Sequence, residues 1–491
     1  MFVRTKQQSN GKVSILIVEN VREFGKVRQK TLRHVATVLP DEVDRFKELA
    51  EHIRADMKVA REQNLSKIRE ESRIVTGIHE IYGSLYDEIG FSGIFKSCRI
   101  SGSVFKDMVM ARLAKPCSKR SSAELLERDF GICIAIEKIY RMMDILTEKR
   151  INRIRDCCWY HSKGLLTEEI KVMFCDCTTL YFESFTKGEL RRFGSGKDHK
   201  FNQGQILLAL MVTREGLPVG YDVFPGNRYE SDTFKHAIEK IKTRYRVKRV
   251  VIVADSSLLS MQNVELLEKE NLQYILGARL KSLPKNWQDR ILDNTDYDKK
   301  KKEDEILRIA TYQYAKNRRL IVSHSTKRAD KDRKNREKAN EEKPERDALW
   351  DGLHGIITNV KEKEMNAEEA LSQYHGLWQA EESFRLQKHD LKVRPVFHWS
   401  IKRIKAHIAI CFAAFSLIRF LQYRLKRKTG EYFSAERIKD ELFGIQESIL
   451  VNTTDNNKYV LPSTPGQYAI KIYDAMSKKR HVVPFRITSK E

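Results

Sequence analysis

Two aspartates lie in apolar segments, where an unpaired carboxylate is costly to bury. Asp176 follows Val172–Cys175, and Asp255 ends the run VKRVVIVAD at residues 247–255. Two such carboxylates on adjacent strands would repel each other unless a cation lay between them. Hard divalent ions with oxygen ligands, Mg²⁺ or Mn²⁺, fit this need best. Either aspartate alone also fits a strand-end turn or a helix cap, so it is the pair that indicates a metal site.

A third acid is suggested by the spacing of residues on a predicted helix. Tyr374, Glu381 and Lys388 are seven residues apart, so successive members lie about 20° apart around an α-helix. Arg385, four residues beyond Glu381, shares that face, whereas Glu382 lies about 100° away. The face could hold a metal ion through Glu381 and a DNA phosphate through Arg385 and Lys388. An exposed helix with an ordinary Glu–Arg pair is the alternative.

The cysteines do not indicate a zinc site or a disulfide framework. There are eight in 491 residues, without a pair of CxxC motifs. Cys175 and Cys177 resemble a metal-binding pair, but on a strand both would point away from the face that carries Asp176. We interpret them as small buried hydrophobic residues.

The segment 161–279 predicts the elements that position the two aspartates. Three strand-like runs precede alternating helices and strands, an order of βββαβαβ. This order predicts an α/β fold, a mixed sheet with helices on both faces, whose site lies at the carboxyl ends of the strands. The predicted strands are 171–182, 205–212, 217–224, 247–255 and 274–276, and the predicted helices are 231–245, capped by Ser231, and 262–269.

A β-rich insertion at 280–365 interrupts this order. It contains strand-like runs at 306–315, 320–323 and 352–359 and is too long for a structureless loop. Its charged helical segment, 327–342, is either a solvated helix or a DNA contact. Helical pattern returns at 366–430 and includes Ile401–Lys428. Residues 401–430 hold eight Lys and Arg and no acid, so one face should pack on the core while the basic ends could meet phosphates.

The N-terminal 160 residues divide into a β-ribbon at 1–40 and a helical DNA-binding or dimerisation region at 41–160. Residues 41–80 are predicted to be helical, with Asp41 as the N-cap. Ser121 or Ser122 could cap a helix-turn-helix near 121–146, although a helical bundle without a DNA role has the same pattern. Residues 431–491 form a C-terminal region without a recognisable motif.

The charge balance indicates a polyanionic partner. There are 91 Lys and Arg and 67 Asp and Glu, a net charge of +24, which favours nucleic acid because basic side chains neutralise phosphates. The longest apolar stretch, Ile408–Ile418, is shorter than the roughly 20 residues that span a bilayer. The N-terminus has no apolar segment typical of a signal peptide. We therefore expect a soluble cytoplasmic protein without a membrane partner.

Three strings in this sequence resemble the signature regions of DDE transposases of bacterial insertion sequences. They are CDCTTLYF around Asp176, VIVADSSLLS around Asp255 and YHGLWQAEESFRLQK around Glu381. Tyr374, Glu381 and Lys388 match the spacing of the Y-x2-R-x3-E-x6-K signature of one transposase group. The similarity covers about residues 165–430, and a weaker likeness extends to the N-terminal ribbon.

The resemblance implies an RNase H-like catalytic domain, 161–279 with 366–430, split by the insertion. It implies that Asp176, Asp255 and Glu381 are catalytic and hold two Mg²⁺ or Mn²⁺ ions for phosphoryl transfer, while Tyr374, Arg385 and Lys388 contact DNA. It also implies that the protein binds terminal inverted repeats, cleaves the element's ends and joins them to target DNA. A homodimer on double-stranded DNA, associated with the bacterial nucleoid, follows from pairing two ends.

Two departures from the family pattern stand in this chain. Leu377 occupies the position of the signature arginine, so that phosphate contact is absent or comes from Arg385 or another residue. Ser256-Ser257 follows Asp255 where a residue and a glycine are expected. Both departures leave the three acids intact. An RNase H-like nuclease or resolvase without strand transfer, or an inactive DNA-binding relative, remains an alternative.

Overall fold

The computed structural model describes residues 1–23, 26–62, 67–166, 172–182, 190, 204–227, 251–255, 261–293, 297–302, 305–339 and 347–487. Contacts divide the chain into two compact units, which we treat separately. Unit 1 comprises residues 1–73, 447–462 and 482–491, and unit 2 comprises residues 74–446 and 463–481. The predicted helix 231–245, Ser256-Ser257 and His199 lie outside the described residues.

Unit 1 begins with the predicted β-ribbon, which forms three antiparallel strands. β1 (Phe2–Gln7), β2 (Val13–Glu23) and β3 (Lys26–Val38) pair in that order. Helix α1 (Val43–Glu62) packs on them around a small core of Ile15, Val38 and Ala50. A 3-10 turn, η1 (Pro40–Glu42), contains Asp41, so the predicted N-cap at this residue is wrong. Pro40 fixes the backbone entering this turn, and the α-helix begins at Val43.

The predicted helix at 41–80 is also wrong at residues 68–75, whereas residues 77–80 are helical as the first turn of α2. Residues Ile68–Val75 form strand β4 in a sheet of order β16-β15-β14-β4, with β14 (Gln446–Asn452), β15 (Lys458–Pro462) and β16 (Phe485–Arg486). The segment IREESRIV has helix-forming glutamates and arginines, but its pairing partner is far along the chain. Local propensity could not reveal that partner, and the tertiary pairing overrides the propensity.

The helical region of unit 2 runs from α2 to α6. Its helices are α2 (Gly77–Ile89), α3 (Arg99–Ala114), α4 (Lys119–Phe130), α5 (Ile136–Ile145) and α6 (Glu148–Leu165), with a 3-10 segment η3 (Phe91–Phe95). Helix α4 ends at Gly131, whose φ of 68° suits glycine. The cap of α4 is Ser118, which accepts a hydrogen bond from the Ser121 backbone, and not Ser121 or Ser122. The helix–turn–helix order is present, while its DNA-reading role stays a prediction.

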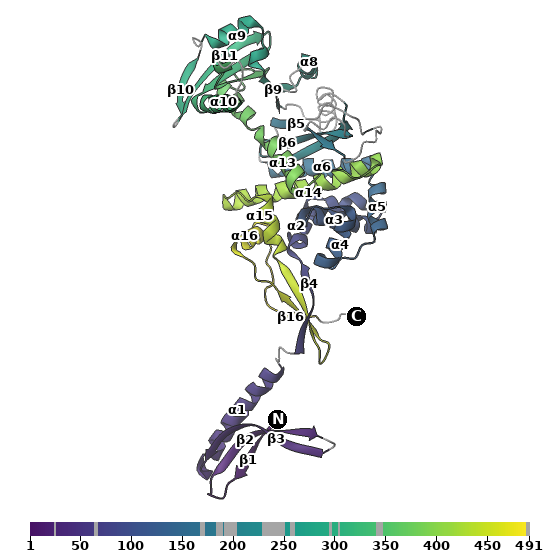
Figure 1. Cartoon of the computed structure of the whole chain (residues 1–491), viewed down its shortest axis with the longest axis vertical. Helices are drawn as coiled ribbons and strands as arrows, with labels where there is room; N and C mark the ends of the chain where they lie inside the picture. The colour runs from purple at the N-terminus through teal and green to yellow at the C-terminus, as the bar shows by residue number, and fades with distance from the viewer. Residues whose placement is uncertain are drawn as a thin grey trace. The chain divides into compact units, whose positions relative to one another are not determined.

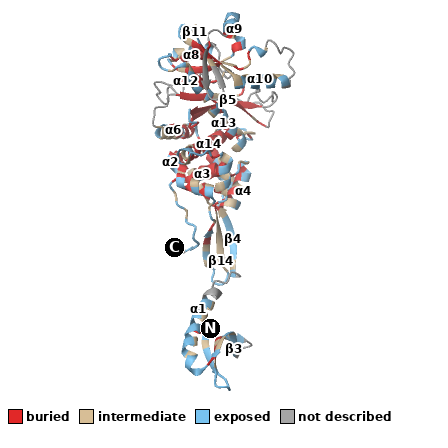
Figure 2. Ribbon diagram, turned by 90° about the vertical axis from the view of Figure 1, so that its left-hand side faces the viewer, coloured by how far each residue is buried: buried red, intermediate tan, exposed pale blue. Residues whose placement is uncertain are grey.

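The catalytic sheet has the predicted order, which confirms the mixed α/β fold. β5 (Val172–Tyr181), β6 (Gln205–Thr213) and β7 (Pro218–Pro225) form an antiparallel meander, and β8 (Val251–Ala254) and β9 (Gln273–Ala278) add in parallel on the other side of β5. The spatial order β7-β6-β5-β8-β9 is the RNase H-like arrangement that the resemblance implies. Helix α8 (Met261–Lys269) connects β8 and β9. Buried residues concentrate in these strands (Figure 2).

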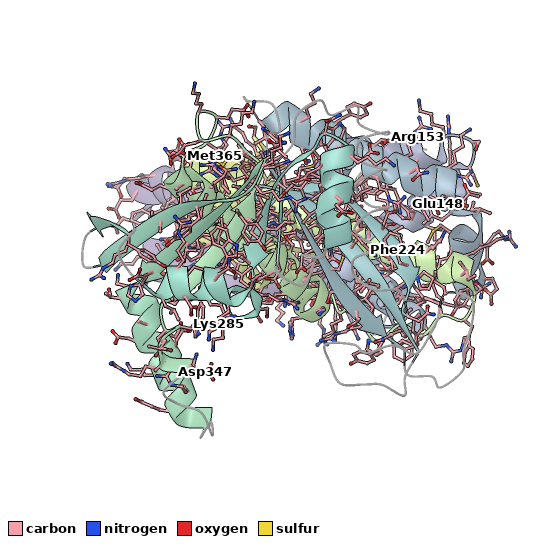
Figure 3. The ribbon with its side chains drawn as sticks, turned by 90° about the horizontal axis from the view of Figure 1, so that it is seen from above. Glu148, Arg153, Phe224, Lys285, Asp347 and Met365 are labelled. Atoms are coloured by element: carbon pink, nitrogen blue, oxygen red, sulfur yellow. The ribbon has the colours of Figure 1, made fainter. Side chains whose placement is uncertain are left out.

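The strands of the predicted insertion extend this same sheet. β13 (Leu353–Thr358) pairs antiparallel with β9, and β12 (Arg318–Ser325), β11 (Glu305–Ala315) and β10 (Asp298–Lys302) follow outward. The predicted charged helix is α10 (Thr326–Ala339), whereas α9 (Lys285–Leu292), β10 and the 3-10 turn η5 (Leu280–Ser282) were not predicted. Viewed from above, Lys285 and Asp347 of the insertion lie opposite Glu148 and Arg153 across the sheet (Figure 3).

Helix α14 (Ile401–Thr429) lies between the sheet and the helical region (Figure 1). By length and composition it could cross a membrane, but 94% of its most apolar window is buried in the protein, as in a core helix. Its basic ends pair with protein groups: Arg403 with Asp144 and Lys405 with Glu148. Helices α15 (Ala435–Phe443) and α16 (Gln467–Ala475) complete unit 2.

Candidate active site

The strand register brings Asp176 and Asp255 side by side. β5 and β8 are parallel, with Val172 opposite Val251 and Phe174 opposite Val253. Two residues further along both strands, the same register places Asp176 opposite Asp255. Adjacent strands lie roughly 4.8 Å apart, and side chains at matching positions share a face. The two aspartates therefore lie on one face of the sheet, Asp176 in the middle of β5 and Asp255 directly after the carboxyl end of β8.

The packing of the neighbouring residues identifies which face this is. Phe174 and Val253, two residues before the aspartates, belong to the large core that includes Leu377 and Phe384. Cys175 and Ala254 belong to the core on the other side of the sheet. The cysteine interpretation is thus confirmed: Cys175 and Cys177 are buried away from Asp176. The acids face the helices that carry the signature motif.

Helices α12 (Ala367–His375) and α13 (Trp378–Arg385) pack over that face, α12 on β8 and β9, and α13 on β5 and β6. They do not form the single helix that the seven-residue spacing assumed. Gly376 and Leu377 separate them, and a π-helical turn, η6 (Leu386–Asp390), follows. A break and a π turn both shift the angular position of later side chains. The stripe derived from a regular 3.6-residue period is therefore not the geometry of this segment.

Tyr374 contacts an acid directly. Its hydroxyl donates to Asp255 Oδ1 across 3.4 Å, and its ring lies 4.9 Å from the imidazole of His354. Burial raises the pKa of Tyr374, and the carboxylate of Asp255 raises it further. The phenol is therefore protonated and can donate to Asp255 at neutral pH. We had predicted a DNA contact for Tyr374; the structure adds an interaction with the acid itself.

Glu381 is exposed on α13. Its negative charge is the smallest of the causes that raise the pKa of Tyr374, after burial and Asp255. Lys388 is partly exposed within the π turn. Leu377, the residue in place of the signature arginine, is only 6% exposed and packs in the core.

Arg385 is engaged by Glu382. Its Nε and Nη2 donate to the two carboxylate oxygens of Glu382 at 2.7 and 2.6 Å. The hydrogen bond from Arg385 lowers the pKa of Glu382. A bidentate pair of this kind is geometrically specific. The guanidinium that we expected to meet a phosphate is thus held by the neighbouring acid, which we had expected to point elsewhere.

The acids fit a divalent cation by ligand type and by strand position. Asp176 and Asp255 supply hard oxygen ligands from adjacent strands, and Glu381 supplies a third near Tyr374. The carboxylate of Asp176 also accepts a hydrogen bond of 2.7 Å from the Cys177 backbone. Within the described ranges, no group of three or more His, Cys, Asp or Glu side chains is positioned to hold an ion.

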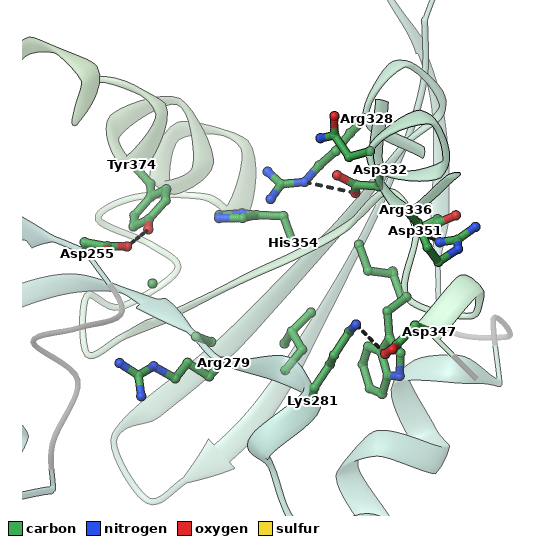
Figure 4. Close-up of a pocket in the computed structure, with 16 residues that line it drawn as sticks. Asp255, Arg279, Lys281, Arg328, Asp332, Arg336, Asp347, Asp351, His354 and Tyr374 are labelled. Carbon is green, nitrogen blue, oxygen red and sulfur yellow. Dashed lines mark hydrogen bonds and ion pairs between the residues drawn. The ribbon is translucent and has the colours of Figure 1, made fainter. Parts of the chain in front are cut away.

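A cavity of about 700 Å³ opens beside Asp255 and reaches into the insertion. Tyr374 and His354 line it together with basic residues, among them Arg279, directly after β9, and Arg328 of the insertion (Figure 4). Sequence reasoning missed these residues. The only signal was the placement of His354 at the start of a predicted strand and of Arg328 at the start of a charged helix. Neither position indicated proximity to Asp255.

His407 is structural. It is 5% exposed, its Nε2 lies 3.1 Å from the Val393 carbonyl, and its Nδ1 lies 3.2 Å from the amino group of Lys119. Burial lowers the pKa of His407 well below its ordinary value. The neutral imidazole therefore ties α14 to α4 in the core.

Comparisons with known proteins agree with the mixed α/β fold of the chain. The family described as Transposase DDE domain matches residues 168–417, about half of the chain, and the IS1634 family transposase N-terminal domain matches residues 2–64. The chain belongs to the DDE transposases of bacterial insertion sequences. It is therefore a DNA transposase, a metal-dependent enzyme of DNA cleavage and strand transfer.

Solved transposases also show similarity to the chain. A piggyBac transposase in a synaptic complex with hairpin DNA is 11% identical over 75% of this chain and 76% of that chain, with a TM-score of 0.40. The Mos1 transposase in a paired-end complex with the left transposon end is 13% identical over 32% of this chain and 53% of that chain, with a TM-score of 0.16. No curated protein matches the sequence.

Proposed function

We propose that this transposase binds the terminal inverted repeats of its insertion sequence, cleaves the element's ends and joins them to target DNA. Asp176, Asp255 and Glu381 are its catalytic acids and metal ligands in this proposal. The observation that carries it is the β5–β8 register, which puts Asp176 opposite Asp255 on the face covered by α12 and α13.

Two divalent ions, Mg²⁺ or Mn²⁺, would supply Lewis-acid stabilisation of the attacking and leaving oxygens of the phosphodiester. The chain's own residues prepare the site. Asp176, whose carboxylate accepts a hydrogen bond from the Cys177 backbone, would hold an ion together with Asp255 and Glu381. Tyr374 holds the Asp255 carboxylate through its hydroxyl.

Tyr374, Arg385 and Lys388 orient the DNA strand in this proposal, with Arg385 exchanging Glu382 for a phosphate. The net charge of +24 supports binding of two DNA duplexes, the element ends and the target. Because strand transfer pairs two ends, the proposal places two copies of the chain in the DNA complex. The helical region at 41–160 or the C-terminal segment would supply the interface.

The experiment that tests this function supplies pre-cleaved inverted-repeat ends, a supercoiled target plasmid and Mg²⁺. We expect joined products from the unaltered protein. Asp176→Asn should bind the ends with unchanged affinity yet form at least about a thousandfold less product, because losing an ion ligand removes several kcal/mol of transition-state stabilisation.

Glu381→Gln should behave in the same way, and Glu362→Gln, an exposed carboxylate elsewhere in unit 2, should join ends normally. Cleavage of uncut ends without any joining of pre-cleaved ends would instead identify a nuclease. Normal joining by Asp176→Asn would show that the site assignment is wrong.

A further inference from the structure

The two helices that carry the signature, α12 and α13, contain no arginine whose side chain is without a carboxylate partner. Leu377 occupies the signature arginine position and is only 6% exposed. Arg385, the arginine that this segment does contain, is held by both carboxylate oxygens of Glu382. A transposase of this chain's composition still has to fix the phosphate next to the bond that it cuts, because phosphate contacts set the register of DNA in a site.

The cavity beside Asp255 contains two arginines from a different part of the chain. Arg328 is the third residue of α10, and Arg279 follows directly after β9. Both line the same cavity as Asp255 and Tyr374 (Figure 4). The two guanidinium groups therefore share one cavity with a catalytic acid, although Arg279 and Arg328 are separated from the signature helix in sequence.

Arg328 acts electrostatically on the side chains that surround Asp255. Burial lowers the pKa of His354 to about 4, and the positive charge of Arg328 lowers it further while Asp255 opposes the shift. The same charge of Arg328 counteracts the raised pKa of Tyr374. His354 is consequently neutral at physiological pH, so the positive charge on this side of Asp255 comes from the arginines.

The side chains of Arg279 and Arg328 make weaker contacts with carboxylates than the side chains of Lys281 and Arg336 in the same cavity. Lys281 bonds Asp347 at 2.6 Å, and Arg336 pairs with Asp351. The ion pair of Arg328 with Asp332 is 3.7 Å long, beyond hydrogen-bond distance, and the Arg328 side chain is 47% exposed. The side chain of Arg279 makes no hydrogen bond or ion pair within the described part of the chain.

We propose that Arg328 and Arg279 bind a backbone phosphate of the DNA strand next to the cleaved bond, in place of the arginine that Leu377 replaces. The inference rests on the proposed function and adds a phosphate subsite built by Arg328 of the insertion and by Arg279, directly after β9. The ring of His354, 4.9 Å from that of Tyr374, lies between Tyr374 and Arg328 (Figure 4). A phosphate that contacts either guanidinium gains charge-assisted hydrogen bonds that an arginine paired with a carboxylate cannot give.

The test measures binding in the absence of cleavage. Asp176→Asn protein is titrated with fluorescent inverted-repeat ends, either unmodified or carrying one neutral methylphosphonate at successive positions around the element's end. Arg328→Ala should weaken binding of the unmodified end by about tenfold to a hundredfold, the size expected for a charged hydrogen bond. Arg279→Ala should act in the same direction.

A single methylphosphonate should reproduce this loss in protein that retains Arg328 and cause no additional loss in Arg328→Ala. The matched control is Arg333→Ala on the same helix, whose arginine is 57% exposed and pairs with Asp330 at 2.8 Å. It should change affinity by less than about twofold, as expected for an exposed pair. Circular dichroism melting checks that the variants fold alike, which the exposure of these arginines favours.

Equal losses of DNA affinity from Arg328→Ala and Arg333→Ala would show that the effect comes from overall charge, and would overturn the proposed subsite. So would additive losses from Arg328→Ala and every methylphosphonate, or unchanged binding by Arg328→Ala. Failure of the proposed function is distinct from these outcomes. In that case protein with its natural Asp176 would neither cut nor join ends. One methylphosphonate position would still weaken binding only in protein that retains Arg328.

Discussion

The two halves of the catalytic site are built by different physical means. Asp176 and Asp255 lie on parallel strands whose register is fixed by backbone pairing and by buried neighbours on both faces. Tyr374, Glu381 and Lys388 lie on three short helical pieces joined at Gly376–Leu377 and at the turn after Arg385. The strand half holds its acids through backbone hydrogen bonds between strands, whereas the helix half is held by the side-chain packing of α12 and α13 on the sheet.

This difference predicts where the site is fragile. A change in the strand half that preserves shape should remove chemistry and leave the fold intact. A change at the junction of the helices should move Glu381 relative to both aspartates. The three predictions below address the helix half, because there the structure and the regular helical period disagree.

The largest effect is expected at the junction itself, from Gly376→Ala. A Cβ at this position would lie 2.6 Å from Phe174 Cζ and 3.0 Å from the Gln373 carbonyl oxygen. The backbone φ of −65° is open to any residue, so glycine is required here by space alone. We expect the free energy of unfolding to fall by about 1–3 kcal/mol, the usual cost of overpacking, and end cleavage to fall with it because α13 is displaced.

Denaturant unfolding and a cleavage assay measure the two effects of Gly376→Ala. Gly164→Ala is the matched control, since no atom lies within 4 Å of the added Cβ in helix α6. Its stability should stay the same or rise slightly. Unchanged stability and cleavage in Gly376→Ala would mean that Phe174 yields easily and that α13 is not fixed by this contact.

The sequence predicted the strand half better than the helix half for a physical reason. Strand side chains alternate with a period of two, so an apolar run with an embedded Asp176 determines which face the acid takes. The helix prediction needed an unbroken 3.6-residue period over fifteen residues. Gly376 and the π turn interrupt that period, and no single residue before Lys388 indicates a π turn.

Other features depended on contacts between segments distant in sequence. Strand β4 forms in a segment with helix-forming residues because it joins a sheet with strands near the C-terminus. The approach of Arg328 and His354 to Asp255 requires β13 to pair with β9. Such pairings depend on tertiary packing, which single-sequence patterns do not contain.

An intermediate effect is expected from Tyr374→Phe, which tests the hydrogen bond between Tyr374 of the helix half and Asp255 of the strand half. The variant removes the hydroxyl that lies 3.4 Å from Asp255 Oδ1 and keeps the ring beside His354. Because a hydrogen bond to a charged group usually contributes about 1.5–3 kcal/mol, and this one is long, we expect a loss near or below the lower bound, roughly tenfold or less. The loss should appear as a higher Mg²⁺ concentration for half-maximal cleavage.

Tyr160→Phe is the control for this variant, because Tyr160 is 67% exposed on α6. It should leave the Mg²⁺ dependence unchanged. If Tyr374→Phe weakened the binding of DNA ends but left the Mg²⁺ dependence intact, the tyrosine would serve the DNA and not the acid. That result would separate the two roles that the site geometry allows.

The smallest effects are expected at the Arg385–Glu382 pair. Here the direction of each change in DNA affinity distinguishes the possible roles of Arg385. Arg385 is 56% exposed, and exposed pairs contribute about 1 kcal/mol or less. Arg385→Ala should therefore hardly change stability and weaken DNA binding about twofold to threefold, provided that the arginine exchanges Glu382 for a phosphate. Glu382→Gln releases the same guanidinium and should tighten binding by a similar factor. Fluorescence anisotropy at two salt concentrations resolves changes of this size, and both should shrink as salt rises. Weaker binding in both variants would mean that the pair acts as a unit that positions α13, and Arg385 would then belong to the scaffold of Glu381.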